Sequence, residues 1–209
     1  MNVALKVAKS ARKAKGDGHL RRAEILDAAA RIFAADGYEG ATIRRIADEV
    51  GVSSTALYMH FRDKDEILHE ICQDAIRMMV EEISAIADEP ADPVERVRRI
   101  LVANVRGWLA QPHVFRLIYY SDRSGSEETE AAKAGHRARF YDRYLNVVRE
   151  VATSGRLRVG DTESAAQGMW AACHGLISML IVRPSFGWAP ADTLTNVMID
   201  GLLYGTVTV

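Results

Sequence analysis

The sequence predicts an all-α protein with a short N-terminal helical unit and a larger C-terminal helical body. Apolar residues recur at the three- and four-residue spacing of helices in successive segments, and no segment shows the two-residue alternation of a half-buried strand. Capping residues precede these patterns, and Gly or Pro follows them. The 209 residues, 48% of them hydrophobic and 26% charged, suffice for a sizeable core in one or two domains.

Charge is unevenly distributed along the chain. Residues 1–62 hold 11 Lys and Arg against 7 Asp and Glu, whereas the remainder holds 16 against 21, so the net charge of −1 hides a basic end. A basic end on an acidic body is typical of proteins that touch nucleic acid with one end. Residues 1–18 are predicted as a basic tail, either solvated and disordered or serving as an arm with additional phosphate contacts.

Two short helical patterns lie between Thr42 and Lys64, in the segment TIRRIADEVGVSSTALYMHFRDK. An apolar stripe follows Thr42, whose hydroxyl can cap a helix, and Gly51 stops that helix because glycine tolerates a left-handed backbone. Ser53 can cap the second helix, expected over Ser53 to Phe61. Helices this short must be docked by neighbours, and an earlier amphipathic helix over residues 20–36 can do this. The layout is that of a helix-turn-helix.

The outward face of the second pattern carries hydroxyls and rings, where an ordinary solvated face carries Glu and Lys. With Leu57 and Phe61 pointing inward, the residues left outside are Ser54, Thr55, Tyr58 and His60. Basic residues flank them, namely Arg44, Arg45, Arg62 and Lys64. Such groups bond phosphate oxygens and base edges. An ordinary helical hairpin with a Gly turn is the alternative interpretation.

In combination these residues resemble the DNA-binding domain of the TetR family of transcriptional regulators. The similarity runs from Leu20 to Leu68 and rests on Gly37-Tyr38, Ala41 to Ala47, Gly51-Val52-Ser53, Leu57-Tyr58, His60-Phe61 and Lys64. It implies an all-helical homodimer whose three-helix heads, residues 19–66, read a palindromic operator in double-stranded DNA. It also implies a body, residues 67–209, that holds the dimer together and binds a small-molecule effector, which moves the heads apart and releases the DNA.

The predicted DNA contacts combine this resemblance with the outward-facing side chains. Base edges or the adjacent backbone are the expected partners of Ser54, Thr55 and Tyr58. The phosphate anchors, by analogy with matching family positions, are Thr42, Arg44, Tyr58, His60 and Lys64. Arg44 is an alternative reader of guanine. Arg45 and Ser53 complete the predicted DNA-binding set.

Six further helices are expected after the helix-turn-helix. Asp63 and Glu66 have capping-box spacing for a long helix that connects head and body and ends at Asp88-Glu89-Pro90. The next begins at Asp92-Pro93 and stops at Gln111-Pro112. The others are expected over residues 113–120, 129–154, 162–182 and 190–205, with a polar loop from Ser121 to Glu128.

The uncharged helix expected over residues 162–182 carries small residues at helical spacing. Another helix can approach closely at Gly168, Ala172 and Gly175, and Ile177 and Leu180 add apolar bulk. In the TetR family the last two long helices of each subunit form a four-helix interface. The resemblance therefore implies that these five residues contribute to the dimer interface.

Aromatic residues are concentrated in the body, where most are expected to form the core. The resemblance implies an effector site there, and a mostly apolar lining suggests a hydrophobic or aromatic ligand. The candidate lining residues are Trp108, Phe115, Tyr119, Phe140, Tyr144, Trp170 and His174, with Arg77 and Asn104 as further polar candidates. Trp170…His174-Gly175 also resembles the Trp–His–Gly signature of one C-terminal subfamily. A histidine on an apolar helix is more often a core residue than a ligand-binding one.

The sequence shows no metal-ligand spacing, phosphate-binding Gly loop or nucleophile elbow, so no catalytic residue, metal or cofactor is predicted. Its two cysteines, Cys72 and Cys173, form no disulfide framework and favour a reducing compartment. Buried structural thiols are expected, with a cysteine redox sensor as the alternative. The uncharged run from Ala165 to Val182 is interpreted as a buried helix rather than a membrane span, and with no secretory signal a cytoplasmic protein is expected.

The sequence therefore predicts a DNA-binding repressor that leaves a palindromic operator when a hydrophobic or aromatic ligand binds the body. One alternative keeps DNA binding but replaces the small ligand by a protein partner. Filling of the effector site by the chain's own side chains would favour that alternative.

Overall fold

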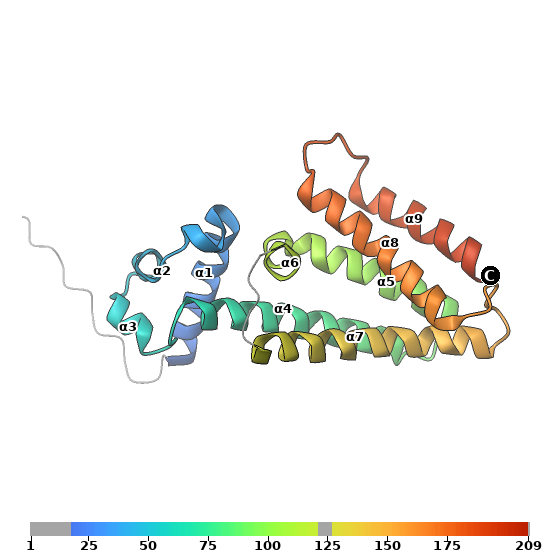
Figure 1. The fold of residues 1–209 in the computed structure, drawn as a ribbon, viewed down its shortest axis with the longest axis horizontal. Helices are drawn as coiled ribbons and strands as arrows, with labels where there is room; N and C mark the ends of the chain where they lie inside the picture. The colour runs from blue at the N-terminus through green and yellow to red at the C-terminus, as the bar shows by residue number, and fades with distance from the viewer. Residues whose placement is uncertain (1–17, 121–126, 209) are drawn as a thin grey trace, which may run out of the picture. The chain divides into compact units, whose positions relative to one another are not determined.

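The computed structural model describes residues 18–120 and 127–208 (Figure 1). The expected basic tail lies outside the described residues except for Gly18, and so does most of the loop from Ser121 to Glu128. The described parts are helical, and an isolated antiparallel bridge between Leu157 and Val207 is the β pairing found among them. The predicted all-α fold is confirmed.

The chain divides into two compact units, the first ending at Ile67 and the second beginning at Leu68. The first unit contains α1 (Gly18–Gly40), α2 (Ile43–Val50), α3 (Ser54–Tyr58) and the first turn of α4 (Lys64–Ala87). The second contains the rest of α4, followed by α5 (Pro93–Ala110), α6 (Pro112–Tyr119), α7 (Glu127–Thr153), α8 (Thr162–Val182) and α9 (Ala191–Thr206).

The core of the first unit forms where α1 packs on α2 and α2 packs on α3. The apolar face predicted for the first helix is buried, with Ile25, Ala28, Ala29, Ile32 and Phe33 at most 6% exposed. Opposite it lie the buried residues Ile46, Ala47, Leu57 and Phe61. Gly37 interrupts α1 one residue after the predicted end. Its φ of 71° and ψ of 176° are not helical, and glycine adopts this conformation readily because it has no Cβ.

The turn between α2 and α3 has the predicted caps. Thr42 Oγ1 accepts a hydrogen bond from the Arg45 amide at 3.2 Å, and Ser53 Oγ accepts one from the Ala56 amide at 3.1 Å. Between them Gly51 adopts the left-handed conformation, with φ 72° and ψ 36°, that ends α2.

The second helix of the motif is shorter than the predicted span from Ser53 to Phe61, because α3 ends at Tyr58. The His60 amide bonds the Leu57 carbonyl at 2.9 Å, a three-residue closure that tightens the chain into a turn. This turn carries Phe61 into the core and lets α4 begin three residues later.

Helix α5 is the centre of the second unit and packs against α6, α7, α8 and α9. Asp92 caps it by accepting hydrogen bonds from the amides of Val94 (2.9 Å) and Glu95 (3.2 Å), as the sequence predicts. The buried Arg96 donates to the Ala87 carbonyl at 2.6 Å and pairs with Glu150 of α7. This guanidinium therefore ties the end of α4 to both α5 and α7.

Candidate DNA interface and effector site

The two capping hydroxyls of the helix-turn-helix are positioned to donate outward. Thr42 and Ser53 are exposed, and each side-chain oxygen already accepts a backbone amide. A hydroxyl that accepts one bond keeps its own proton for another partner. Each cap can therefore bond a phosphate oxygen while it holds its helix.

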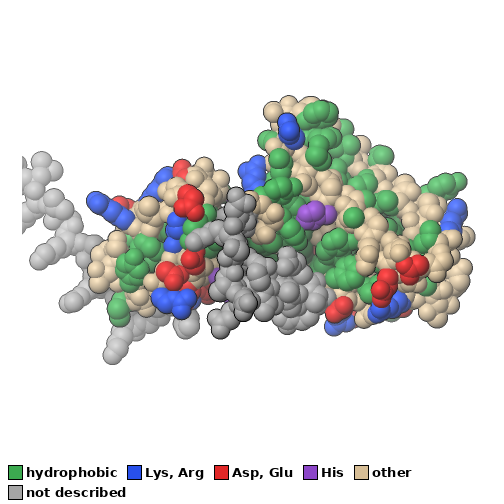
Figure 2. Space-filling view, in the orientation of Figure 1, with side chains coloured by type: hydrophobic (Ala, Val, Ile, Leu, Met, Phe, Trp, Pro, Cys, Tyr) green, Lys and Arg blue, Asp and Glu red, His purple; other side chains and the backbone are tan. Residues whose placement is uncertain are grey.

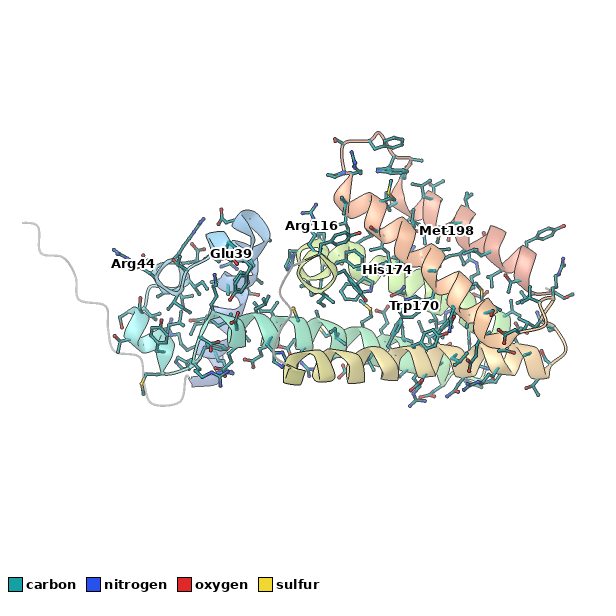
Figure 3. The ribbon with its side chains drawn as sticks, in the orientation of Figure 1. Glu39, Arg44, Arg116, Trp170, His174 and Met198 are labelled. Atoms are coloured by element: carbon teal, nitrogen blue, oxygen red, sulfur yellow. The ribbon has the colours of Figure 1, made fainter. Side chains whose placement is uncertain are left out.

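The two arginines at the start of α2 differ in their surroundings. Arg44 extends from the helix (Figure 3) with its side chain 88% exposed, and its distance to Asp48 is 4.0 Å. Arg45 pairs with Asp36 at 2.6 Å. Arg44 is thus accessible to a nucleic acid, whereas Arg45 contributes to holding α2 against α1.

Lys64 is engaged within the first unit. Its ammonium donates to the carbonyls of Tyr38 at 2.7 Å and Ala41 at 2.9 Å, and it lies 3.8 Å from the centre of the Tyr38 ring. Two of its three N–H donors are therefore occupied. This arrangement favours a positioning role for Lys64 over the direct phosphate contact expected from the sequence.

The remaining predicted DNA contacts lie at or just after α3. Thr55 and Tyr58 are exposed, and Ser54 and His60 are half-buried. Sequence reasoning missed Met59, which is 82% exposed at the end of this helix. It also missed Arg22, which lies 4.0 Å above the Phe61 ring and donates to the His60 carbonyl. No periodic pattern signals Arg22, because its role depends on α1 and the turn meeting in space.

In the body, Trp170 and His174 lie one turn apart on α8 and join two aromatic groups (Figure 3). Trp170 packs edge-on against Phe140 of α7, with ring centres 4.4 Å apart. His174 packs against Tyr119 of α6 at 4.5 Å and against Phe115 at 5.1 Å. Tyr144 also packs on Trp170, and Trp108 packs on Phe115 and Tyr119, so all seven predicted lining residues belong to these two groups.

Several predicted lining residues are core residues in this structure. Phe115 and Tyr144 are fully buried, and the Tyr144 hydroxyl donates to the Ala166 carbonyl at 3.1 Å. Trp108 and Phe140 are each only 6% exposed. These four are buried, whereas Tyr119, Trp170 and His174 retain partly exposed surface. Arg77 is exposed and paired with Asp74 at 2.8 Å.

Two polar groups of the body stand out by their surroundings. Burial lowers the pKa of His174, so the neutral imidazole is favoured among its aromatic neighbours. Asn104 on α5 is 2% exposed, and its Oδ1 is buried without a hydrogen-bond partner. A buried acceptor without a partner costs roughly 1–3 kcal/mol of stability, so an unpaired Asn104 Oδ1 is unusual in a folded protein.

The predicted dimer residues divide into two groups on α8. Gly168 and Gly175 are exposed, and Ala172 and Leu180 are partly exposed. Ile177 is fully buried inside the single chain, on the opposite side of α8 from Gly175, so the exposed face of this helix does not include it. In Figure 2 hydrophobic side chains gather over the α8–α9 part of the body.

Both cysteines are buried, and burial raises the pKa of the Cys173 thiol to about 12. A protonated, buried thiol is a poor nucleophile and a poor redox sensor. Within the described ranges no group of three or more His, Cys, Asp and Glu side chains is arranged to hold a metal ion.

One described helix, Thr162–Val182, is long and apolar enough to cross a membrane by length and composition. A third of its most apolar window, 33%, is buried. Core helices of soluble proteins meet the same criterion, so this is weak evidence for a span.

Comparison with known protein families gives two matches. The family described as "Bacterial regulatory proteins, tetR family" matches residues 25–71, which include the helix-turn-helix. The family described as "Tetracyclin repressor-like, C-terminal domain" matches residues 97–202, which is half of the chain.

Individual relatives are transcriptional regulators. The chain is 32% identical over 107 residues to the transcriptional repressor KstR2 of Mycobacterium tuberculosis, a match covering 51% of this chain and 52% of the relative. It is 48% identical over 60 residues to the repressor AcnR of Corynebacterium diphtheriae, covering 28% and 32%. The chain thus spans about half the length, or less, of these curated relatives.

The fold resembles solved structures over most of the chain. The regulator PfmR of Thermus thermophilus superposes with a TM-score of 0.75 at 28% identity, covering 86% of this chain and 97% of that one. Sequence and fold comparisons therefore agree across both units.

Proposed function

Since this chain belongs to the TetR family of transcriptional regulators, we propose that it is a cytoplasmic repressor that binds a palindromic operator as a homodimer and leaves it when an apolar ligand binds the body. The family consists of DNA-binding regulators, so the chain is a regulator of transcription and not an enzyme. The observation that best supports the proposal is the capped helix-turn-helix with outward hydroxyls and an almost fully exposed Arg44.

On DNA, α3 enters the major groove, and Ser54, Thr55 and Tyr58 contact base edges or the adjacent backbone. Thr42, Ser53 and His60 bond phosphates. Arg44 neutralises a phosphate or reaches guanine, and its 88% exposure supports either role. Arg45 and Lys64 position this surface through their bonds to Asp36 and to the carbonyl of Tyr38.

The dimer forms through the exposed faces of α8 and α9. On α8 this face contains Gly168, Ala171, Gly175, Met179 and Val182, all of them exposed. On α9 it contains Val197, Gly201, Tyr204 and Gly205. A second copy covering these uncharged residues removes apolar surface from water, and the glycines let its helices approach closely. The two heads then meet successive major grooves about 34–36 Å apart.

The effector binds beside the partly exposed Tyr119, Trp170 and His174. Aromatic rings suit a hydrophobic or aromatic ligand, as the sequence predicts. The unpartnered Oδ1 of Asn104 supports a ligand that also carries an N–H or O–H donor. Ligand binding then satisfies an acceptor that the free protein leaves unpaired.

Helix α4 carries the response, because it starts in the head unit and continues into the body. Within the head, its first residues are fastened by Lys64 to Tyr38 and Ala41, and by Glu66 to Arg22 at 3.6 Å. A tilt of α4 therefore moves the whole helix-turn-helix with it. The ligand shifts the equilibrium only by its difference in affinity for the DNA-bound and released arrangements.

A protein partner in place of the small ligand is the second candidate. Burial of Phe115 and Tyr144 favours it, since the chain's own side chains fill part of the expected site. The two candidates share the DNA-binding head and differ in what reaches the body.

A thermal-shift screen with lipophilic and aromatic compounds, followed by operator release, tests the effector. A ligand at 100 times its Kd adds about 2.7 kcal/mol to the free energy of unfolding, which is easily measured. A stabilising compound that also lowers DNA affinity supports the ligand switch. Absence of any hit, or hits that leave DNA affinity unchanged, favours the protein partner.

The variant Asn104→Leu tests whether Asn104 bonds the ligand. Leucine has a similar size and removes the unpaired acceptor, so the free variant should be at least as stable as the parent. It should lose most of the shift produced by a donor-bearing hit and keep the shift produced by a hit without donors. An unchanged response to both kinds of compound would exclude Asn104 from the site.

A further inference from the structure

The exposed large hydrophobic side chains of the first unit are adjacent. Among its described residues they are Tyr58, 55% exposed, and Met59, 82% exposed. Met59 is also the most exposed of the large hydrophobic side chains in the described part of the whole chain. The apolar surface of the head is thus concentrated at the end of α3.

The backbone fixes where the Met59 side chain projects. Its amide bonds the Ala56 carbonyl at 3.3 Å, and its φ of −72° and ψ of −17° continue the helical path of α3. Thr55 lies four residues earlier, so the two side chains share one face, and both are exposed. The Thr55 methyl and the Met59 thioether form a short apolar strip on the surface that carries the hydroxyls.

Exposed arginines of the same helix-turn-helix segment indicate the partner of this strip. Arg44 and Arg62 are 88% and 82% exposed, and both lie in the same helix-turn-helix segment. Arginine favours a polyanion over an apolar protein surface. The major groove of DNA offers one apolar group beside its polar edges, the C5-methyl of thymine.

We propose that Met59 packs on the C5-methyl of a thymine in each half of the operator and so contributes to its sequence preference. The inference rests on the proposed binding of DNA by α3. Methionine suits this contact, because its unbranched, polarisable side chain adapts to an irregular surface. Its exposure in the free protein leaves it available without rearrangement of the core.

The test begins with selection of bound sequences from a random duplex library by the full-length protein. In the selected operator each thymine is then replaced in turn by deoxyuridine, which removes only the methyl group. At one thymine per half-site this change should weaken binding about fourfold, the value of one buried methyl. Met59→Ala should bind more weakly than the parent and be indifferent to the same replacement.

Met78→Ala provides the matched control, because Met78 is also exposed, at 61%, but lies on α4 in the second unit. This variant should keep the parent's affinity and its thymine dependence. Met59 is a surface residue, and thermal denaturation of Met59→Ala should match that of the parent.

Two results would overturn the inference while DNA binding stands. One is a selected operator in which no thymine depends on its methyl group. The other is Met59→Ala that retains the full deoxyuridine effect. Failure of the parent protein to enrich any sequence would instead remove the proposed function, and this inference with it.

Discussion

The ammonium of Lys64 donates a hydrogen bond to the backbone carbonyl of Tyr38 at 2.7 Å and so ties the first residue of α4 to the end of α1. Lys64→Met keeps most of the length of the side chain and removes this bond, together with the bond to Ala41. Because hydrogen bonds from charged donors contribute about 1.5–3 kcal/mol, the head should become less stable and lose affinity for all DNA sequences alike. Thermal denaturation and DNA titrations over a salt series measure both effects.

A different outcome for Lys64→Met would restore the role expected from the sequence. Unchanged thermal stability, combined with a smaller dependence of DNA affinity on salt, would show that Lys64 contacts phosphate directly.

Arg44→Ala should lower DNA affinity without lowering the stability of the head. Arg44 is almost fully exposed, so the melting temperature should stay unchanged while DNA affinity falls and the salt dependence decreases by about one ion per head. Arg77→Ala, which alters an exposed arginine on α4 in the body, should leave DNA affinity as it is. Equal affinities for Arg44→Ala and the parent would remove Arg44 from the interface.

Gly175→Arg should produce a folded monomer. A Cβ built on Gly175 meets nothing within 4 Å, so arginine fits the single chain but obstructs a second helix at this face. Light scattering after size-exclusion chromatography should give half the parent's mass, with unchanged helix content by circular dichroism. Gly160→Arg is the control, since Gly160 is equally open and precedes α8. A dimeric Gly175→Arg would place the interface elsewhere.

Asp63 should stabilise the head in a pH-dependent way. Its carboxylate accepts the Glu66 amide at 2.8 Å, and this bond holds the pKa of Asp63 below its ordinary value. Asp63→Ala should lose about 1 kcal/mol at neutral pH through loss of the cap. A depressed pKa gives stability that is present above the unfolded value and lost as the pH falls through the folded value. The difference from the parent should therefore shrink below about pH 4.

Asp63→Ser separates the cap from the charge. Serine caps helices as well as aspartate does but does not titrate in this range. In denaturant unfolding at pH 7, Asp63→Ser should be nearly as stable as the parent. Between pH 7 and pH 3 it should lack the loss of stability that protonation of Asp63 causes in the parent. A gap between Asp63→Ala and the parent that stays constant down to pH 3 would contradict this account.

Neither cysteine should respond to oxidants in the folded protein. Cys72 and Cys173 are buried, and the raised pKa of Cys173 keeps its thiol protonated. Alkylation by iodoacetamide at pH 8 should be slow in the native protein and rapid in denaturant. Mild peroxide should leave DNA affinity unaltered; a reversible change in affinity would favour the redox-sensor alternative.

Local signals in the sequence were sufficient for much of the fold. Thr42, Gly51 and Ser53 act within a few residues of their own positions, so their caps and turn were predictable. Two helices of the body, α5 and α8, were predictable in the same way from Asp92 and Asp161, which cap them.

Features that depend on contacts between distant segments were not predictable. The internal bonds of Lys64 join residues 26 and 23 positions apart, and nothing in the local pattern distinguishes them from a phosphate contact. Burial of Ile177 within one chain depends on how α8 packs against α5 and α9. For the same reason aromatic content alone did not separate the fully buried Phe115 from the partly exposed His174.

Selection of bound duplexes from a random library by the full-length protein is the most direct test of operator binding. We expect an inverted repeat whose half-sites are centred about 34–36 Å apart, with affinity that falls steeply as salt increases. Enrichment of no sequence, or of a single site without a repeat, would contradict binding of a palindromic operator by a TetR-type dimer.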